Sequence, residues 1–359
     1  MSKVIQAIEQ IGQSLWLDYI RRESLKNGEL ARQVTKEGIV GLTSNPSIFE
    51  QAIAHSKDYD EALTALLAAG KSDVEIYEAL VVEDIQLAAD ILRKVYDKTD
   101  GRDGYVSLEV SPLLARDTKA TIEEAKRLHK LVDRPNLLIK VPGTAEGLPA
   151  IRALIAEGVS VNVTLIFSQR QYLEVWEAFV SGMEDRQKAK QPLKPVASVA
   201  SFFVSRIDSA VDAKLPAGSS LQGKAAIANA KAAYQQHLEA ISGERWRNLA
   251  ADGARVQRML WASTSTKNPS YPDTMYVDNL IGPNTVNTLP PQTHKAFLDH
   301  GKVSNALTED LAAARRTLQG LPVASVNLEA VCDDLVADGV KKFADAYTKL
   351  IAAIASRRK

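Results

Sequence analysis

A lysine stands inside an apolar run of the sequence. The segment LLIKV places Lys140 beside Leu138, Ile139 and Val141. A buried ammonium needs a partner, solvent or a shifted pKa, because burying it unpaired is costly. Apolar flanks favour the neutral amine, which can add to a ketone carbonyl and form a Schiff base. The alternative is a lysine that pairs with Glu109 inside the fold and serves stability.

Polar residues also interrupt two other apolar segments. SLEV contains Glu109, and VNVTLIF contains Asn162 and Thr164, which are two residues apart and share one face of a strand. Polar side chains near the carboxyl ends of barrel strands usually form an active site. We therefore expect these three side chains to lie near Lys140.

Three further residues each have a functional and a structural interpretation. Asn45 is followed by Pro46, so it can cap a helix as well as contact a ligand. Asp18 follows an apolar WL and is either a turn acid or a site acid. Arg206 follows SFFV and is either a salt-bridging arginine or a cation for an anionic substrate.

A hydroxyl-rich segment, WASTSTKNPSYP, follows a predicted strand. It contains Ser263 and Lys267. It is either an ordinary solvated loop or a phosphate-binding loop, because serine and lysine side chains after a barrel strand suit phosphate oxygens.

Other chemistries find little support in the sequence. GxGxxG after a strand, GxxxxGK[ST] and GxSxG are all absent, and the five histidines include no pair at zinc-binding spacing. We therefore expect no metal and no cofactor.

Eight short β-rich segments alternate with helical ones. Alternation of this kind implies a parallel sheet, and eight repeats favour an α/β fold with a single closed (β/α)8 barrel of the TIM type. The segments are 15–20, 38–43, 105–110, 136–141, 159–167, 195–200, 256–263 and 284–288.

Two regions exceed a minimal barrel. Residues 58–99 have the pattern of two inserted helices, and residues 303–359 read as helices with no strand after them. No flexible linker separates either region from the rest. The expected organisation is a barrel catalytic domain over 1–302, with C-terminal helices over 303–359 packed on the same domain.

Composition limits the range of partners. The chain has 359 residues, with 44 basic and 44 acidic side chains, so the formal charge is zero. This balance argues against nucleic acid or a membrane as the main partner. A single cysteine and the lack of a long apolar stretch predict a cytoplasmic protein. The sequence leaves open whether it forms a homo-oligomer.

The motifs together resemble the transaldolase family, class I Schiff-base enzymes of the pentose phosphate pathway in carbohydrate metabolism. The resemblance rests on GLTSNPSIF, VSLEVSP, LIKVPGTAEG, VNVTLIFS and VASFFVSRID, in the expected order. WASTSTKNPSYPD, GPNTVNTLP and the length are similar to a longer bacterial branch of the family.

The resemblance implies a role for each candidate residue. Lys140 would form the Schiff base with the dihydroxyacetone unit of a ketose phosphate, and Asp18 would accept the C4 hydroxyl proton. Glu109 and Thr164 would hold the catalytic water. The remaining implied residues are Asn45, Asn162 and Ser201 for the dihydroxyacetone hydroxyls, with Thr43 nearby, Arg206 and Ser263 for the phosphate, and Phe203 near the reacting carbons.

The sequence departs from the family pattern after the seventh strand. Members commonly place an arginine close to the serine, whereas here Ser263 is followed by TSTK, so Lys267 would have to replace it. The reaction implied moves dihydroxyacetone between sedoheptulose 7-phosphate or fructose 6-phosphate and erythrose 4-phosphate or glyceraldehyde 3-phosphate. The rivals are a fructose 6-phosphate aldolase, whose members are shorter and tend to have Tyr where Phe203 stands, and a non-catalytic sugar-phosphate-binding barrel.

Overall fold

The computed structural model describes residues 3–358, and within them eight parallel strands close into a barrel in sequence order. The predicted (β/α)8 fold is confirmed. Residues 1 and 2 of the predicted barrel domain and residue 359 of the predicted C-terminal helices lie outside the described residues. The strands are β1 Ser14–Asp18, β2 Ile39–Thr43, β3 Val106–Glu109, β4 Leu137–Pro142, β5 Val161–Ile166, β6 Ser198–Phe203, β7 Arg258–Ala262 and β8 Val286–Leu289.

Each predicted strand is present, and the largest error is at β6. The sequence predicts 195–200, whereas the strand is Ser198–Phe203. Pro195 cannot donate to a strand ladder, and the backbone amide of Val196 instead closes a turn on Leu193. At the carboxyl end of the strand, the buried residues 201–203 continue the pairing with β7. The shift places Ser201 and Phe203 on the strand itself.

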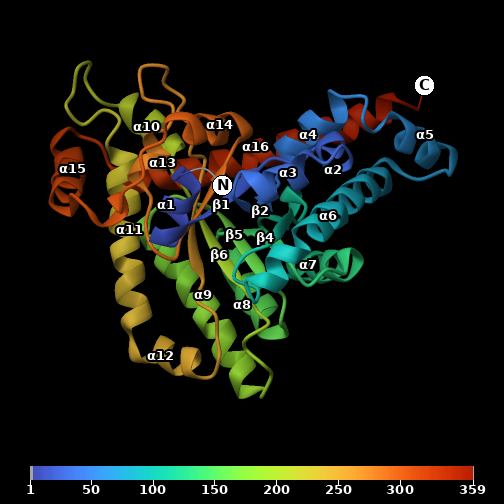
Figure 1. Cartoon of the computed structure of the whole chain (residues 1–359), viewed down its shortest axis with the longest axis horizontal. Helices are drawn as coiled ribbons and strands as arrows, with labels where there is room; N and C mark the ends of the chain where they lie inside the picture. Colours follow the sequence, from blue (N-terminus) through green and yellow to red (C-terminus); the bar gives the residue numbers. More distant parts are fainter. Residues whose placement is uncertain (1–2, 359) are drawn as a thin grey trace.

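Helices surround this barrel (Figure 1). They are α1 Lys3–Ile11, α2 Arg22–Lys26, α3 Glu29–Lys36, α4 Pro46–Ala54, α5 Asp60–Ala68, α6 Asp73–Lys98, α7 Thr118–Val132, α8 Gly147–Glu157, α9 Gln169–Lys188, α10 Ser205–Asp212, α11 Ala225–Ser242, α12 Glu244–Ala251, α13 Met275–Asn279, α14 Pro291–His300, α15 Leu311–Val323 and α16 Leu328–Ser356, with 3-10 turns at Pro112–Leu114 and Ala306–Thr308.

Capping residues set where three of these helices begin. Ser72 and Glu75 form a complete capping box at α6, and Asn45 caps α4 with Pro46 in its first turn. Ser168 caps α9, but the Gln171 side chain does not return to the cap. Its amide instead accepts from Phe167 N at 2.9 Å and donates to the carbonyl of Gly143 at 2.7 Å. Gln171 therefore ties α9 to the ends of β4 and β5.

The two regions beyond a minimal barrel are helical, as predicted. The insertion between β2 and β3 forms α5 and α6, and no strand follows β8 in the described part of the chain. The last helix, α16, packs against α4, α6, α10 and β5. Figure 1 shows it in red beside the blue α4, above the strands.

Small and aromatic residues on one face of α16 allow it to cover the carboxyl ends of the strands. A Cβ atom on Gly339 would lie only 2.8 Å from the Leu165 side chain, at the irregular end of β5, so glycine permits this close approach. Phe343 and Tyr347 follow at intervals of four residues, and both are buried.

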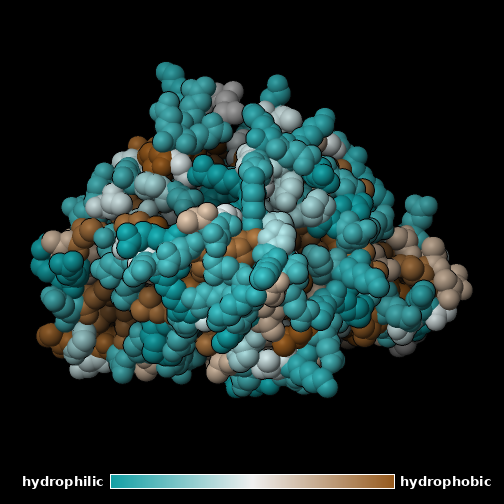
Figure 2. All heavy atoms as spheres, turned by 90° about the horizontal axis from the view of Figure 1, so that it is seen from below, coloured by the Kyte–Doolittle hydropathy of each residue, from teal (hydrophilic) through white to brown (hydrophobic). Residues whose placement is uncertain are grey.

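The surface carries no concentrated apolar patch on the face drawn in Figure 2, where hydrophilic residues predominate and hydrophobic atoms occur in separate areas. None of the helices within 3–358 is long and apolar enough to cross a membrane.

Candidate active site

Lys140 lies in β4 between two polar neighbours. It pairs in register with Glu109 of β3 and with Asn162 of β5. The lysine is only 4% exposed. Its Nζ donates to the carbonyl of Ser44 at 2.9 Å and lies 3.5 Å from Oε2 of Glu109. Both interpretations of Lys140 therefore have a structural basis, because the lysine has an acidic partner and also faces a pocket.

The pocket in front of Lys140, here the central pocket, has a volume of about 150 Å³. It lies at the carboxyl ends of the strands, where barrel enzymes place their active sites. Each of the predicted site residues lines it except Glu109 and Asn162. The lining residues are Asp18, Thr43, Asn45, Lys140, Thr164, Ser201, Phe203, Arg206, Ala262, Ser263, Ser265, Lys267, Thr288, Pro290 and Phe343.

Glu109 lies behind Lys140 and lines a second cavity, here the side cavity, of about 250 Å³. Burial raises the pKa of this carboxyl to about 7, although the Lys140 charge opposes the rise. Its Oε2 atom has no hydrogen-bond partner among the described residues. A carboxyl with a pKa near neutrality beside an amine can give and take a proton.

Asn162 lies beneath the pocket rather than in its wall. Ser201 donates to Oδ1 of Asn162 at 2.7 Å, and Nδ2 of Asn162 donates to Ser107 at 3.0 Å. These bonds fix the Ser201 hydroxyl, which does line the pocket. The Thr164 hydroxyl is buried with no hydrogen-bond partner in the described chain. It is therefore available to a ligand or a water molecule.

Asp18 is the last residue of β1, and its carboxyl group accepts a hydrogen bond from the first of two linked threonine hydroxyls. Thr43 donates to Oδ1 of Asp18 at 2.6 Å, so the 2.6 Å contact between Thr43 and Thr288 has Thr288 as its donor. Burial raises the pKa of Asp18, while Lys140 and the Thr43 hydrogen bond oppose the rise. The arrangement places a carboxyl group that can accept a proton in the same pocket as Lys140.

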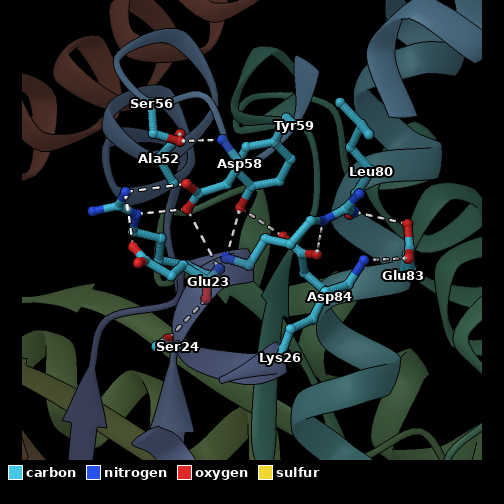
Figure 3. Close-up of polar contacts among 12 residues, drawn as sticks. Glu23, Ser24, Lys26, Ala52, Ser56, Asp58, Tyr59, Leu80, Glu83 and Asp84 are labelled. Carbon is cyan, nitrogen blue, oxygen red and sulfur yellow. Dashed lines mark hydrogen bonds and ion pairs between the residues drawn. The ribbon is translucent and has the colours of Figure 1, made fainter. Parts of the chain in front are cut away.

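The chain that follows Asp18 is anchored by a buried polar network. Nε of Arg22 donates to Asp84 of α6 at 2.8 Å, and the Tyr59 hydroxyl donates to the other Asp84 oxygen at 2.7 Å. Burial raises the pKa of Asp84 to about 6. Figure 3 shows Asp84 and Tyr59 pointing toward each other, with Asp58 beside them. The inserted helices therefore hold the β1 end that carries Asp18.

Asn45 and Arg206 stand where the central pocket meets an outer hollow, and both line each of the two spaces. Oδ1 of Asn45 accepts from Ile48 N at 3.0 Å, so this cap does not use the amide nitrogen. Arg206 lies near the start of α10, with its guanidinium 5.3 Å from the Phe203 ring centre. Its Nη1 is buried with no partner in the described chain, so a donor remains for an anion.

The loop after β7 brings hydroxyls and a second cation to the pocket. Ser263 adopts a left-handed backbone with φ of 56° and shares a 2.9 Å hydrogen bond with Ser205. Lys267 reaches the pocket from the longer loop, and its Nζ donates to Ser265 at 2.7 Å. Burial, and then the nearby Arg206 charge, lower the pKa of Lys267.

Comparison with known proteins agrees with this geometry. The family model for transaldolase/fructose-6-phosphate aldolase matches residues 15–354. The chain belongs to this family. A transaldolase of Trichodesmium erythraeum is 46% identical over 98% of this chain and 97% of its own length. A transaldolase of Frankia alni is 47% identical over 99% of this chain and 98% of its own.

The family resemblance drawn from the motifs is therefore confirmed, and the chain is a transaldolase-family enzyme. Sequence reasoning missed five residues that line its pocket, and one of them, Ala262, is the last residue of β7. Thr288 stands in a predicted strand and could have been found from its polarity, as could Ser265 from its loop. No sequence pattern marks Pro290 or Phe343 as a pocket residue. Their positions in the pocket wall depend on where β8 ends and on how α16 packs over the barrel.

No group of three histidine, cysteine, aspartate or glutamate side chains within 3–358 is arranged to hold a metal ion. The single cysteine, Cys332, lies in α16, and its thiol donates to the carbonyl of Phe167 at 3.3 Å. Burial raises the pKa of this thiol to about 12, so it is an unreactive packing residue.

Proposed function

We propose that the protein is a transaldolase that moves a dihydroxyacetone unit from a ketose phosphate to an aldose phosphate through a Schiff base on Lys140. The donors are sedoheptulose 7-phosphate or fructose 6-phosphate, and the acceptors are glyceraldehyde 3-phosphate or erythrose 4-phosphate. The observation that carries the proposal is a buried lysine that faces a hydroxyl-rich pocket and has a carboxyl group behind it.

Glu109 serves the formation and hydrolysis of the imine. Loss of the carbinolamine hydroxyl requires a proton, and the return of water requires a base. A pKa of about 7 suits Glu109 to both tasks. Thr164 holds the water, because its buried hydroxyl has no partner in the described chain.

Asp18 takes the proton of the C4 hydroxyl as the bond between C3 and C4 breaks. The hydrogen bond from Thr43 fixes one carboxylate oxygen and leaves the other free for substrate. Asn45 and Ser201 bind the hydroxyls of the three-carbon unit, with Thr43 nearby. Asn162 acts by holding Ser201 in place.

Cations at the mouth of the pocket bind the phosphate group. Arg206 offers a buried donor with no protein partner in the described chain, and its planar guanidinium suits phosphate oxygens. Ser263 and Lys267 contribute from the β7 loop. The net charge is zero, so attraction of the anionic substrate depends on this local concentration of positive charge.

Two other functions fit less well. A fructose 6-phosphate aldolase has to protonate the three-carbon intermediate and release it, yet Phe203 presents an apolar ring to the pocket. The relatives named transaldolase also match this chain over nearly their whole length. A non-catalytic sugar-phosphate-binding barrel has no need of the Lys140 and Glu109 pair.

We also propose that residues 1–302 and 303–359 form one catalytic domain, because Phe343 of α16 completes the pocket wall. The cytoplasmic location stays a proposal that rests on the single cysteine.

The test is a transfer assay with purified protein, fructose 6-phosphate and erythrose 4-phosphate. We expect sedoheptulose 7-phosphate and glyceraldehyde 3-phosphate to form together. Release of free dihydroxyacetone in place of sedoheptulose 7-phosphate would favour the aldolase. Binding of fructose 6-phosphate with neither product would favour the non-catalytic barrel.

A further inference from the structure

The side cavity behind Glu109 lies outside the central pocket and has no role in the mechanism above. It is enclosed by α6, α7, α16 and the end of β3. Glu109 forms part of its inner wall. Val74, which is 51% exposed, and the ion-paired Arg127 and Glu78 stand on its solvent side. The cavity therefore runs from the surface to the carboxyl group that contacts Lys140.

The cavity is large and polar enough to hold water. A cavity needs only about 10–15 Å³ of probe-occupied volume for one water molecule, provided that polar partners surround it. The side cavity has about 250 Å³, and its wall includes the hydroxyl-bearing residues Tyr77, Tyr347 and Ser111. Glu109 is only 8% exposed, and its Oε2 atom has no hydrogen-bond partner in the described chain. Water in this space would satisfy that oxygen.

The proposed reaction needs a route for water at this position. The neutral Lys140 amine adds to the C2 carbonyl, and a proton moves from nitrogen to oxygen to give a carbinolamine. The C2–O bond then breaks, and the hydroxyl leaves as water with the proton of the Glu109 carboxyl. A protonated imine and a carboxylate remain, and hydrolysis reverses each step with one water molecule.

The central pocket has a volume of only about 150 Å³, so a bound ketose phosphate would leave little space in it for this water to pass. In the proposed complex, the sugar phosphate would occupy the space in front of Lys140, with its phosphate at Arg206 and Lys267, which line the same pocket. Glu109, which exchanges the proton, faces the other cavity.

We propose that the side cavity is the route by which water leaves and reaches the Lys140 imine while a ketose phosphate occupies the central pocket. This inference rests on the proposed function. It adds a second access path, opened by the inserted helix α6 together with α16.

Variants that fill the cavity test the proposal. Val82→Phe adds volume to the cavity wall from α6, and Val74→Trp narrows the outer end from an exposed position that tolerates substitution. Leu92→Phe is the matched control, because Leu92 is buried in the same helix but does not line the cavity. None of the three residues belongs to the proposed catalytic machinery.

The measurement uses fructose 6-phosphate labelled with oxygen-18 at C2. The loss of label to solvent, corrected for the enzyme-free reaction, reports water exchange. The adduct trapped by borohydride reports imine formation. We expect Val82→Phe and Val74→Trp to lower label loss several-fold per imine formed, with KM unchanged, and Leu92→Phe to match the wild type.

Unchanged label loss in both cavity variants would overturn the proposal. An equal fall in label loss and trapped adduct would also overturn it, because Glu109 would then be distorted rather than cut off from water. Failure of the proposed function has a different signature. A non-catalytic barrel would give no trapped adduct in the wild-type protein, and an aldolase would give the adduct but release free dihydroxyacetone in the transfer assay.

Discussion

Two buried ion pairs lie at opposite ends of the barrel, and they differ in the number of hydrogen bonds that their charged groups make. At the amino-terminal end, Arg258 begins β7 and lies 3.0 Å from Asp103. Arg258 also donates to Ser14 at 2.6 Å and to the carbonyl of Thr285 at 2.8 Å. Asp103 accepts further bonds from Ser14 at 2.8 Å and from Trp16 at 3.1 Å.

The pair at the carboxyl end is left incomplete. Within the described chain, Lys140 has one hydrogen bond, to the carbonyl of Ser44, and a 3.5 Å contact with Glu109. Oε2 of Glu109 has no hydrogen-bond partner among residues 3–358. Each member of the pair also borders a cavity.

The difference separates a structural pair from a chemical one. Nε of Arg258 has no hydrogen-bond partner among the described residues, but its other nitrogens and Asp103 are bonded several times. A buried pair held by many hydrogen bonds resists change, because removing one partner leaves the other charge unpaired. A pair that has unused hydrogen-bonding capacity and borders a cavity can bind a ligand and exchange a proton. Barrels of this type generally keep stability at the amino-terminal end and chemistry at the carboxyl end.

Removing the Lys140 amine is expected to have the largest effect on activity. We expect Lys140→Ala to lower turnover to below about one thousandth of the wild-type value, because Lys140 is the pocket amine that contacts the Glu109 carboxyl. The melting temperature should change little, since the side chain makes few bonds. Steady-state transfer kinetics and thermal unfolding measure the two effects. Residual turnover of a tenth or more would contradict the assignment.

The converse change is Asp103→Ala at the other end. It strands the Arg258 cation in a buried site, so we expect the free energy of unfolding to fall by roughly 3–5 kcal/mol. Turnover per folded molecule should be unchanged. Denaturant unfolding, with activity normalised to the folded fraction, checks both. A large loss of turnover without loss of stability would contradict a purely structural role for the pair of Asp103 and Arg258.

Arg206→Ala tests phosphate binding at the mouth of the pocket. We expect sugar-phosphate binding to weaken by about 1.5–3 kcal/mol, as for loss of a hydrogen bond to a charged group. Reaction with unphosphorylated dihydroxyacetone should be spared. Lys267→Ala is the comparison variant and should cost less, because its amine is already bonded to Ser265. Equal losses for both substrates would indicate a structural role for Arg206.

The pKa of Glu109 predicts a stability change with pH. It rises from an ordinary value of 4.5 to about 7 in the native protein. Between these values the native state holds a proton that the unfolded state has released, so the free energy of unfolding falls as pH rises. The contribution is complete below 4.5 and is lost as pH passes about 7.

Glu109→Gln removes this titration. We expect the wild type to lose stability relative to the variant between about pH 5 and about pH 8. Losing the Lys140 contact lowers the stability of the variant by an amount that does not depend on pH. This constant cost drops out when the changes of the two unfolding free energies with pH are compared. Parallel curves from denaturant unfolding would show that Glu109 titrates in its ordinary range.

The smallest expected effect is a change of partition at Phe203. The ring lines the pocket and lies 5.1 Å from the Phe167 ring, so it has both a packing and a pocket role. Phe203→Tyr adds a hydroxyl that can orient water or deliver a proton to the carbanion-like enamine. We expect more dihydroxyacetone release and less transfer to erythrose 4-phosphate. If the hydroxyl only disturbs packing, both activities fall together and their ratio is unchanged.

Local patterns were sufficient to predict the barrel. The strands alternate with capped helices, and Ser72 and Asn45 begin helices as their spacing indicates. Lys140, Asn162 and Thr164 were recognisable because polar residues in a buried strand require an explanation. The error at β6 arose because Val196 resembles a strand residue by type, but its backbone amide closes a turn next to Pro195.

Long-range placement was not predictable. Nothing in the spacing of Glu109 shows that it borders a different cavity from Lys140. That separation depends on α6, α7 and α16, which come from distant parts of the sequence. Phe343 reaches the pocket only because Gly339 lets α16 approach β5.

The central claim is that covalent chemistry takes place at Lys140, in the incomplete ion pair. The direct test is borohydride reduction of the wild-type protein with fructose 6-phosphate, followed by peptide mass mapping. We predict one adduct carrying the dihydroxyacetone carbons on the peptide that contains Lys140, with Lys267 unmodified. An adduct on Lys267 or any other lysine, or no adduct under conditions of active transfer, would contradict the account.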